Sequence, residues 1–105
     1  MTWSFDAYQR FCRTTAIYPK DASVIYPALG LASEAGEVLG KIKKKIRDGV
    51  ENTDATIDEL GDVLWYVAVL ADDLGVTLSQ VVVRNTDKLI DRADRKMLGG
   101  NGDNR

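Results

Sequence analysis

The sequence predicts an all-α fold, because signs of helical structure recur along its 105 residues. Apolar residues repeat at spacings of three and four, which places them on one face of a helix. Proline and glycine stand between these periodic segments, where helices begin or end. A capping-box pattern from Thr77 to Gln80 marks one further helix start. We therefore expect four helices.

The first two helices are separated by a break at Tyr18-Pro19, since a residue before proline disfavours helical geometry. The first is expected from Ser4 to Ile17. The second is expected to begin near Pro27, with a possible helical turn before it, and to end at Asp48. Gly49 follows as a stop signal. The first helix carries an apolar stripe of Phe5, Tyr8, Phe11, Cys12 and either Thr15 or Ala16.

The third helix is expected to start at Thr53, a suitable N-cap, and to end at Leu74-Gly75. The fourth is expected from Leu78 to Met97 or Leu98, with Thr77 as its N-cap. A single domain over residues 1–105 follows, with a tail at 99–105 too rich in glycine and asparagine for a helix. The second and third helices, joined by a short loop, should be antiparallel neighbours.

Composition excludes several classes of protein. The formal net charge of −2 gives no basic field for a nucleic-acid polymer, and no apolar run is long enough to span a membrane. Cys12 is the single cysteine, so no internal disulfide forms, and the start of the chain has no signal-peptide pattern. We expect a cytoplasmic protein. The lack of histidine excludes His-based catalysis and the Glu-x-x-His pattern of di-iron bundles, and no P-loop motif is present.

Two pairs of carboxylates carry the strongest functional signal. Glu34 and Glu37 lie in the second expected helix, Glu59 and Asp62 in the third, and the i, i+3 spacing turns both members of a pair the same way. Antiparallel packing brings the pairs to similar heights, so that they can face each other. Four like charges in one place repel each other unless a cation lies among them, and oxygen ligands suit Mg²⁺ or Mn²⁺. The alternative is solvated surface pairing, such as Glu37 with Lys41.

Glycines flank and interrupt these pairs. Gly30, Gly36, Gly40 and Gly61 lie inside expected helices, where each costs up to about 1 kcal/mol relative to alanine. Close helix approach or room for a ligand would justify them, and tolerated variation is the other explanation.

The same residues resemble a known family. Glu34-Ala-Gly-Glu37, followed after 21 residues by Glu59-Leu-Gly-Asp62, resembles the Glu-x-x-Glu…Glu-x-x-Asp signature of the MazG-like all-α nucleoside triphosphate pyrophosphohydrolases. The segment 85–92 is similar to the family's Asn-x-x-Lys-Leu-x-x-Arg stretch, and both chain ends resemble a compact single-domain branch found in phages and mobile elements.

The resemblance implies hydrolysis of a nucleoside or deoxynucleoside triphosphate between the α- and β-phosphates, giving the monophosphate and pyrophosphate. It implies Mg²⁺, replaceable by Mn²⁺, held by Glu34, Glu37, Glu59 and Asp62. It also implies a dimer or a tetramer, with the helices forming a bundle across subunits. The role would be control or cleaning of the nucleotide pool.

Further site residues are expected from chemistry and from the resemblance together. Without histidine, Glu34 or Glu37 is the expected proton acceptor for the attacking water. Lys88 and Arg92 share a helical face with Asn85 and are candidates for phosphate binding. The alternative is a solvated face on which Asp87 and Asp91 pair with them. The other substrate-binding candidates are Lys41, Trp65 near the metal face, and Arg105 which, with Asp103, could fold over the site; Lys44 and Arg47 are weaker ones. The rival interpretation is a helical interaction module without catalysis.

Overall fold

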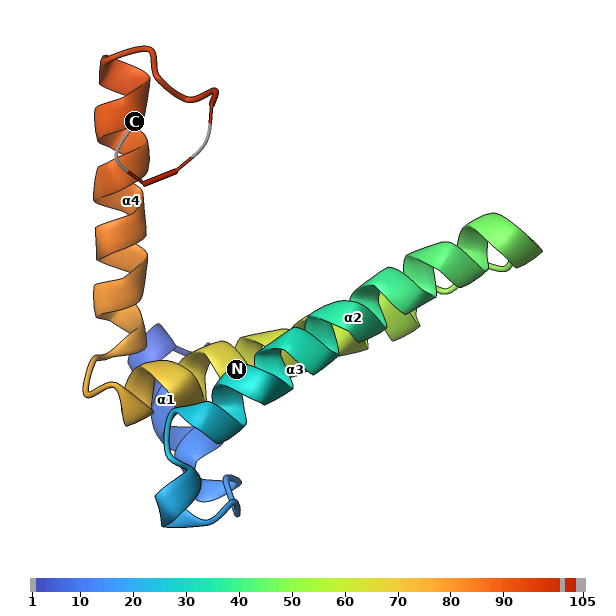
Figure 1. The fold of residues 1–105 in the computed structure, drawn as a ribbon, viewed down its shortest axis with the longest axis horizontal. Helices are drawn as coiled ribbons and strands as arrows, with labels where there is room; N and C mark the ends of the chain where they lie inside the picture. The colour runs from blue at the N-terminus through green and yellow to red at the C-terminus, as the bar shows by residue number, and fades with distance from the viewer. Residues whose placement is uncertain (1, 101, 104–105) are drawn as a thin grey trace.

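A computed structural model describes residues 2–100 and 102–103, and within them every regular element is helical, as predicted. The helices are α1 (Phe5–Thr14), α2 (Ile25–Asp48), α3 (Thr53–Asp73) and α4 (Leu78–Asp94), with a short 3-10 helix η1 (Lys20–Ala22) between α1 and α2. Figure 1 shows α2 and α3 side by side as one long arm, with α1 packed at its base and α4 standing away from it.

The first helix is shorter than predicted. Ser4 caps its start, with the side-chain oxygen accepting from the Ala7 N–H at 3.0 Å. The helix ends at Thr14 rather than Ile17. The N–H groups of Thr15 and Ala16 donate to carbonyls three residues earlier, as in a 3-10 helix, and not four residues earlier as in an α-helix. Ile17 is left 95% exposed.

The second helix begins at Ile25, two residues before the predicted Pro27, which is buried within its first turn. Val24 precedes it with a positive φ of 69°, and its N–H donates to the Asp73 carboxylate at 2.9 Å. At the other end Gly49 adopts the left-handed conformation, φ 66°, and its N–H bonds to the Lys45 carbonyl. The predicted stop at Gly49 is therefore confirmed.

The predicted N-cap of the third helix is wrong by one residue. Asn52 occupies that position, and its side chain donates instead to the Lys41 carbonyl at 2.7 Å, across the turn between α2 and α3. Thr53 is the first helical residue, and both its N–H and its hydroxyl donate to the carboxylate of Glu51. Polar side chains thus close the tight turn that makes α2 and α3 antiparallel neighbours.

The fourth helix confirms the capping box at Thr77 and Gln80, where each side chain binds the other residue's backbone N–H. It ends at Asp94, before the predicted Met97 or Leu98. Lys96 has a positive φ of 58° and the Met97 N–H turns back to the Arg92 carbonyl at 2.6 Å, which ends the helix.

The direction of α4 is set by polar contacts with α1. Buried Gln9 donates to the carbonyls of Ala68 and Val76 and accepts from the Leu78 N–H, each at 3.1 Å. Asp6 accepts from the Ser79 N–H at 3.0 Å. These bonds join the end of α3 to the start of α4, and the two helices are bent by 101° at this junction.

The buried core is small and lies where α1, α3 and the start of α4 meet. Cys12, Ala68, Val69 and Leu78 form it, with Tyr8, Tyr18 and Trp65 packed against it. Cys12, which belongs to the expected apolar stripe of the first helix, is buried.

Much of the predicted apolar surface stays outside this core. Phe5 and Phe11 of the expected stripe on α1 are about half exposed, at 53% and 52%. Along the arm, Leu39 is 70% and Ile46 is 80% exposed. Residues of the arm stay exposed in the single chain because α2 and α3 have only each other to pack against along most of its length (Figure 1).

The helical glycines fall into two groups. A Cβ atom at Gly30 would collide with the ring of Tyr66, so close packing requires glycine there. At Gly36, Gly40 and Gly61, a Cβ would meet no described atom within 4 Å. Close helix approach, one of the two reasons expected for these glycines, is found at Gly30, whereas room for a ligand and tolerated variation stay open for the other three.

No single described helix is both long and apolar enough to cross a bilayer, although α3 and α4, bent at their junction, would together meet the length and composition required.

Candidate active site

Three carboxylates meet between α2 and α3. Glu34 of α2 and Glu59 and Asp62 of α3 each place one oxygen within 4.8 Å of the others. The arrangement follows from the antiparallel pairing, since the turn at 49–52 fixes the register, and from the i, i+3 spacing, which turns Glu59 and Asp62 to the same side of α3. The predicted convergence of the two pairs is thus found for these three side chains.

The three carboxylates lie close enough to repel one another when they are ionised. Glu34 and Glu59 are half-buried, and Asp62 is exposed. Burial raises the pKa of Glu34, and hydrogen bonding with Glu59 and the charge of Asp62 raise it further. A raised carboxyl pKa means that the ionised cluster is unfavourable without a counter-charge. The donor set therefore fits a divalent cation with oxygen ligands, such as Mg²⁺.

Glu37 stays outside this group of ligand atoms. It lies one turn beyond Glu34 on α2 with an exposed side chain, near enough for its charge to contribute to the raised pKa of Glu34. The helix turns Glu37 to the same side as Glu34. The group of ligand atoms nevertheless contains only Glu34, Glu59 and Asp62 among the described residues.

A pocket of about 390 Å³ lies beside the carboxylates. Glu34 and Asp62 form part of its lining, and Thr15, Trp65 and Tyr66 form the rest. The Trp65 indole N–H donates to the Thr15 hydroxyl at 2.8 Å, and the rings of Trp65 and Tyr66 meet edge to face with centroids 4.9 Å apart. The pocket thus combines an acidic side with an aromatic and hydroxyl-bearing side.

Thr15 and Tyr66 are lining residues that sequence reasoning missed. Tyr66 directly follows Trp65, and its fit against Gly30 explains a glycine that the sequence marked. The sequence indicated Thr15 only as an alternative member of the apolar stripe, because it directly follows α1 and reaches the pocket only through the packing of α1 on α3.

A network at the base of the arm holds α1, α3 and the start of α2 together. The buried Asp73 carboxylate accepts from the Arg13 guanidinium at 2.5 Å, from the Tyr18 hydroxyl at 2.6 Å and from the Val24 N–H at 2.9 Å. Tyr18 in turn stacks on Tyr26, with ring centroids 4.8 Å apart. The network fixes Thr15 and the start of α2 relative to α3, and so gives the pocket its shape.

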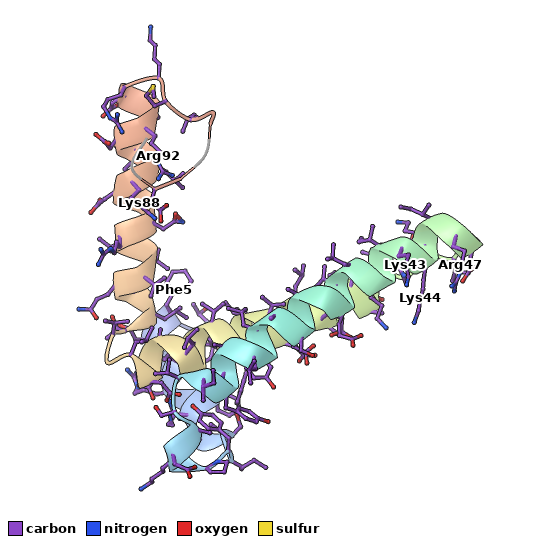
Figure 2. The ribbon with its side chains drawn as sticks, viewed as in Figure 1. Phe5, Lys43, Lys44, Arg47, Lys88 and Arg92 are labelled. Carbon is purple, nitrogen blue, oxygen red and sulfur yellow. The ribbon has the colours of Figure 1, made fainter. Side chains whose placement is uncertain are left out.

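The predicted phosphate-binding residues do not all join the acidic group. Lys41 lies on α2, one turn after Glu37, and is half-buried. Asn85, Lys88 and Arg92 lie on α4, and Figure 2 shows Lys88 and Arg92 on the length of that helix that stands clear of α2 and α3. Lys43, Lys44 and Arg47 lie towards the far end of α2 (Figure 2). Arg105 lies outside the described residues.

Comparison with known proteins decides the family. Residues 27–96 match the MazG nucleotide pyrophosphohydrolase domain, a stretch that contains all four carboxylates and the α4 residues Lys88 and Arg92. The chain belongs to the MazG family. This membership indicates nucleotide pyrophosphohydrolase chemistry on a nucleotide substrate, and the acidic group is compatible with the metal dependence of the family.

Over nearly its whole length the chain is similar to the Gene 37 protein of Mycobacterium phage L5. The two are 50% identical over 111 residues, which cover 95% of this chain and 97% of the relative. This agrees with the expected phage-type branch of the MazG family. No solved structure matches the chain.

Proposed function

We propose that this MazG-family protein hydrolyses a nucleoside or deoxynucleoside triphosphate between the α- and β-phosphates, releasing the monophosphate and pyrophosphate. The observation that carries the proposal is the group formed by Glu34, Glu59 and Asp62 beside a pocket, in a chain whose family acts on nucleotides. A triphosphate is itself strongly anionic, so an acidic site can bind it only together with cations.

Glu34, Glu59 and Asp62 would hold Mg²⁺, or Mn²⁺ in its place, and Glu37 would join them by a change of side-chain rotamer. A bound Mg²⁺ supplies positive charge for the phosphate oxygens and lowers the pKa of a coordinated water. These ligands lie on two paired helices, α2 and α3, and not on a loop. The helix backbones therefore fix the distances between the carboxylates.

The proton acceptor for the attacking water is proposed among Glu34 and Glu37. Hydrogen bonding with Glu59 engages Glu34, whereas Glu37 is exposed and outside the group of three. Glu37 is therefore the better placed of the two, since it could bind the metal through one oxygen and orient a water with the other.

The nucleoside would occupy the pocket beside the carboxylates. Trp65 offers a ring face for stacking, and its bond to Thr15 holds the indole in one orientation. Tyr66 closes the adjacent wall against α2 at Gly30. This arrangement puts an aromatic site for the base next to an acidic site for metal-bound phosphate.

The outer phosphates would meet Lys41 of the same chain and Asn85, Lys88 and Arg92 of a second copy. The support for a second copy is the direction of α4, which carries Lys88 and Arg92 away from the arm of its own chain (Figure 2). A dimer, or a tetramer of two dimers, would also cover the exposed apolar residues of the arm. These residues are Leu29, Leu39, Ile42, Ile46, Ile57, Leu60 and Leu64.

The proposed setting is the cytoplasm, or the host cytoplasm for a phage protein, where nucleoside triphosphates are made. The proposed role is control or cleaning of the nucleotide pool. Neither a nucleic-acid polymer nor a membrane is proposed as a partner, in keeping with the net charge of −2.

The test is a panel of ribo- and deoxynucleoside triphosphates incubated with the protein and Mg²⁺, scored for pyrophosphate. We expect release from at least one substrate, loss of release with excess chelator, and recovery with Mn²⁺. Absence of hydrolysis across the panel, together with no binding of Mn²⁺, would support the rival interpretation of a non-catalytic helical interaction module.

A further inference from the structure

The tail beyond α4 turns back onto the helix and contacts its two basic residues. One Asp103 carboxylate oxygen lies 3.1 Å from Lys88 Nζ and 3.3 Å from Arg92 Nη2. The Gly102 carbonyl accepts from the same Arg92 nitrogen at 3.4 Å. In Figure 1, the described residues 102 and 103 lie beside α4 and not beyond its end.

The reversal is built into the backbone. Lys96 ends the helix with a left-handed φ, and Gly100 and Gly102 have φ values of 89° and 84°, which favour glycine. The tail can therefore return towards Lys88 without the strain that residues with side chains would suffer at the two glycine positions.

The contact of Asp103 with Lys88 and Arg92 differs in burial and in charge from the other ion pair on α4. The Arg92 side chain is only 7% exposed, whereas Asp103 is 77% and Lys88 40% exposed. Salt bridges with Lys88 and Arg92 hold the pKa of Asp103 below its ordinary value. The neighbouring Asp91 pairs with Arg95 instead, at 2.8 Å, so Asp103 is the carboxylate that the described contacts place on the Lys88–Arg92 pair.

We propose that the C-terminal tail is an autoinhibitory strap, in which the Asp103 carboxylate occupies the Lys88–Arg92 pair in place of a phosphate group and must leave before phosphate binds. The proposal rests on the proposed function, because that function assigns Lys88 and Arg92 to phosphate. Gly102 and Asp103 both occupy the same nitrogen of the Arg92 guanidinium, so a phosphate that binds this nitrogen must displace them. An exposed ion pair is weak, and a triphosphate with several charges can displace it.

The test measures binding of inorganic pyrophosphate by calorimetry without Mg²⁺, so that the carboxylate group on the arm contributes no metal. Asp103→Asn removes the competing charge and keeps the size of the side chain. We expect it to bind pyrophosphate about 3-fold to 10-fold more tightly than the original chain, the range that corresponds to loss of weak exposed ion pairs.

The matched control is Asp91→Asn, which also removes one negative charge, but from a residue of α4 that pairs with Arg95 and not with Lys88 or Arg92. We expect it to change pyrophosphate affinity less than about 2-fold, as for a charge largely screened by salt. In a double-mutant cycle, Lys88→Gln should lower affinity and should reduce the gain caused by Asp103→Asn, because both residues act on one contact.

Unchanged or weaker binding by Asp103→Asn would overturn the strap, and weaker binding would show that Asp103 orients the two cations. An equal gain from Asp91→Asn would show a general charge effect and would also overturn it. Hydrolysis of triphosphates with Mg²⁺ is measured on the same variants. If no variant hydrolyses any substrate while Asp103→Asn still tightens pyrophosphate binding, the strap stands and the proposed function fails; the opposite pattern rejects the strap alone.

Discussion

Glu34 of α2 and Glu59 of α3 place carboxylate oxygens within 4.8 Å of each other, and Asp62 joins them at the same spacing. Burial raises the pKa of Glu34, and hydrogen bonding with Glu59 and the negative charges of Asp62, Glu59 and Glu37 raise it further. The pairing of α2 and α3 holds these like charges close together, and a bound cation would compensate their repulsion. The account of the active site depends on this contact.

Replacing Glu59 by Gln should abolish metal binding while making the metal-free protein more stable to heat. The amide keeps the shape of the side chain and removes one of the repelling charges. Mg²⁺ should raise the melting temperature of the original chain, because it binds only the folded site, and should leave that of Glu59→Gln unchanged. Scanning calorimetry with and without Mg²⁺ measures both effects.

Asp58→Asn is the control for this variant, since Asp58 precedes Glu59 on α3 but lies outside the group of three carboxylates. We expect it to keep the Mg²⁺ shift and the hydrolytic activity, whereas Glu59→Gln should lose about 100-fold or more in activity, as when a metal ligand is removed. An Mg²⁺ shift of normal size in Glu59→Gln would contradict the assignment of Glu59 as a ligand.

Replacing Asp73 by Asn should destabilise the fold by about 2 kcal/mol at neutral pH, because Arg13 loses its most buried partner. Asp72→Asn is the matched control. Asp72 binds the same guanidinium at 2.6 Å but is 44% exposed, so a smaller loss is expected. Urea unfolding of the two variants measures the difference.

The Asp73 contribution should also depend on pH. Burial acts to raise the pKa of Asp73, but hydrogen bonds from Tyr18, Val24 and Arg13 outweigh it and hold the pKa below the ordinary value of 3.8. A depressed carboxyl pKa stabilises the fold above the unfolded value, and the stabilisation is lost as pH falls through the folded value. The difference between the original chain and Asp73→Asn should be constant near neutrality and shrink below pH 3.8. A difference that grows on acidification would contradict this.

Gly30→Ala should destabilise the protein and disturb the pocket, since the added methyl group would collide with the ring of Tyr66. Overpacking of this kind costs about 1–3 kcal/mol, more than alanine gains as a helix former. Gly36→Ala is the matched control in the same helix, because a Cβ atom at Gly36 would have no described atom within 4 Å. It should be neutral or stabilising by up to about 1 kcal/mol in the folding of one chain. Thermal unfolding of both variants gives the comparison, and equal effects would refute the role of Gly30.

The exposed apolar residues of the arm should be covered in solution by a second copy. We expect a dimer or tetramer at micromolar concentration by analytical ultracentrifugation. Leu39→Lys should dissociate it, because a lysine ammonium would be buried in the interface. Ile17→Lys is the control, since Ile17 is 95% exposed in the loop after α1 and away from the arm. A monomeric original chain, or dissociation by Ile17→Lys but not by Leu39→Lys, would reject this interface.

The sequence predicted the four helices well, because their starts and stops depend on residues that are close together in the chain. The capping box at Thr77, the stop at Gly49 and the facing of Glu34 with Glu59 and Asp62 all follow from short-range rules and one tight turn. The ends of α1 and α4 were harder to place, because tight turns formed by backbone bonds end both helices early.

What the sequence left out depends on contacts between distant segments. Thr15 reaches the pocket through the packing of α1, and the direction of α4 depends on the bonds of buried Gln9 with Ala68, Val76 and Leu78. No periodicity encodes that angle, so nothing predicted that Lys88 and Arg92 would stand away from the carboxylates of their own chain. The position of Asp103 on these two residues likewise follows from the reversal of the tail.

The most direct test of the central claim is phosphorus NMR of a deoxynucleoside triphosphate that the protein turns over with Mg²⁺. The account predicts that resonances of the nucleoside monophosphate and of pyrophosphate grow together in equal amounts, and that neither grows with Glu59→Gln. Growth of the diphosphate and of inorganic phosphate would contradict cleavage between the α- and β-phosphates, and full activity of Glu59→Gln would contradict the site.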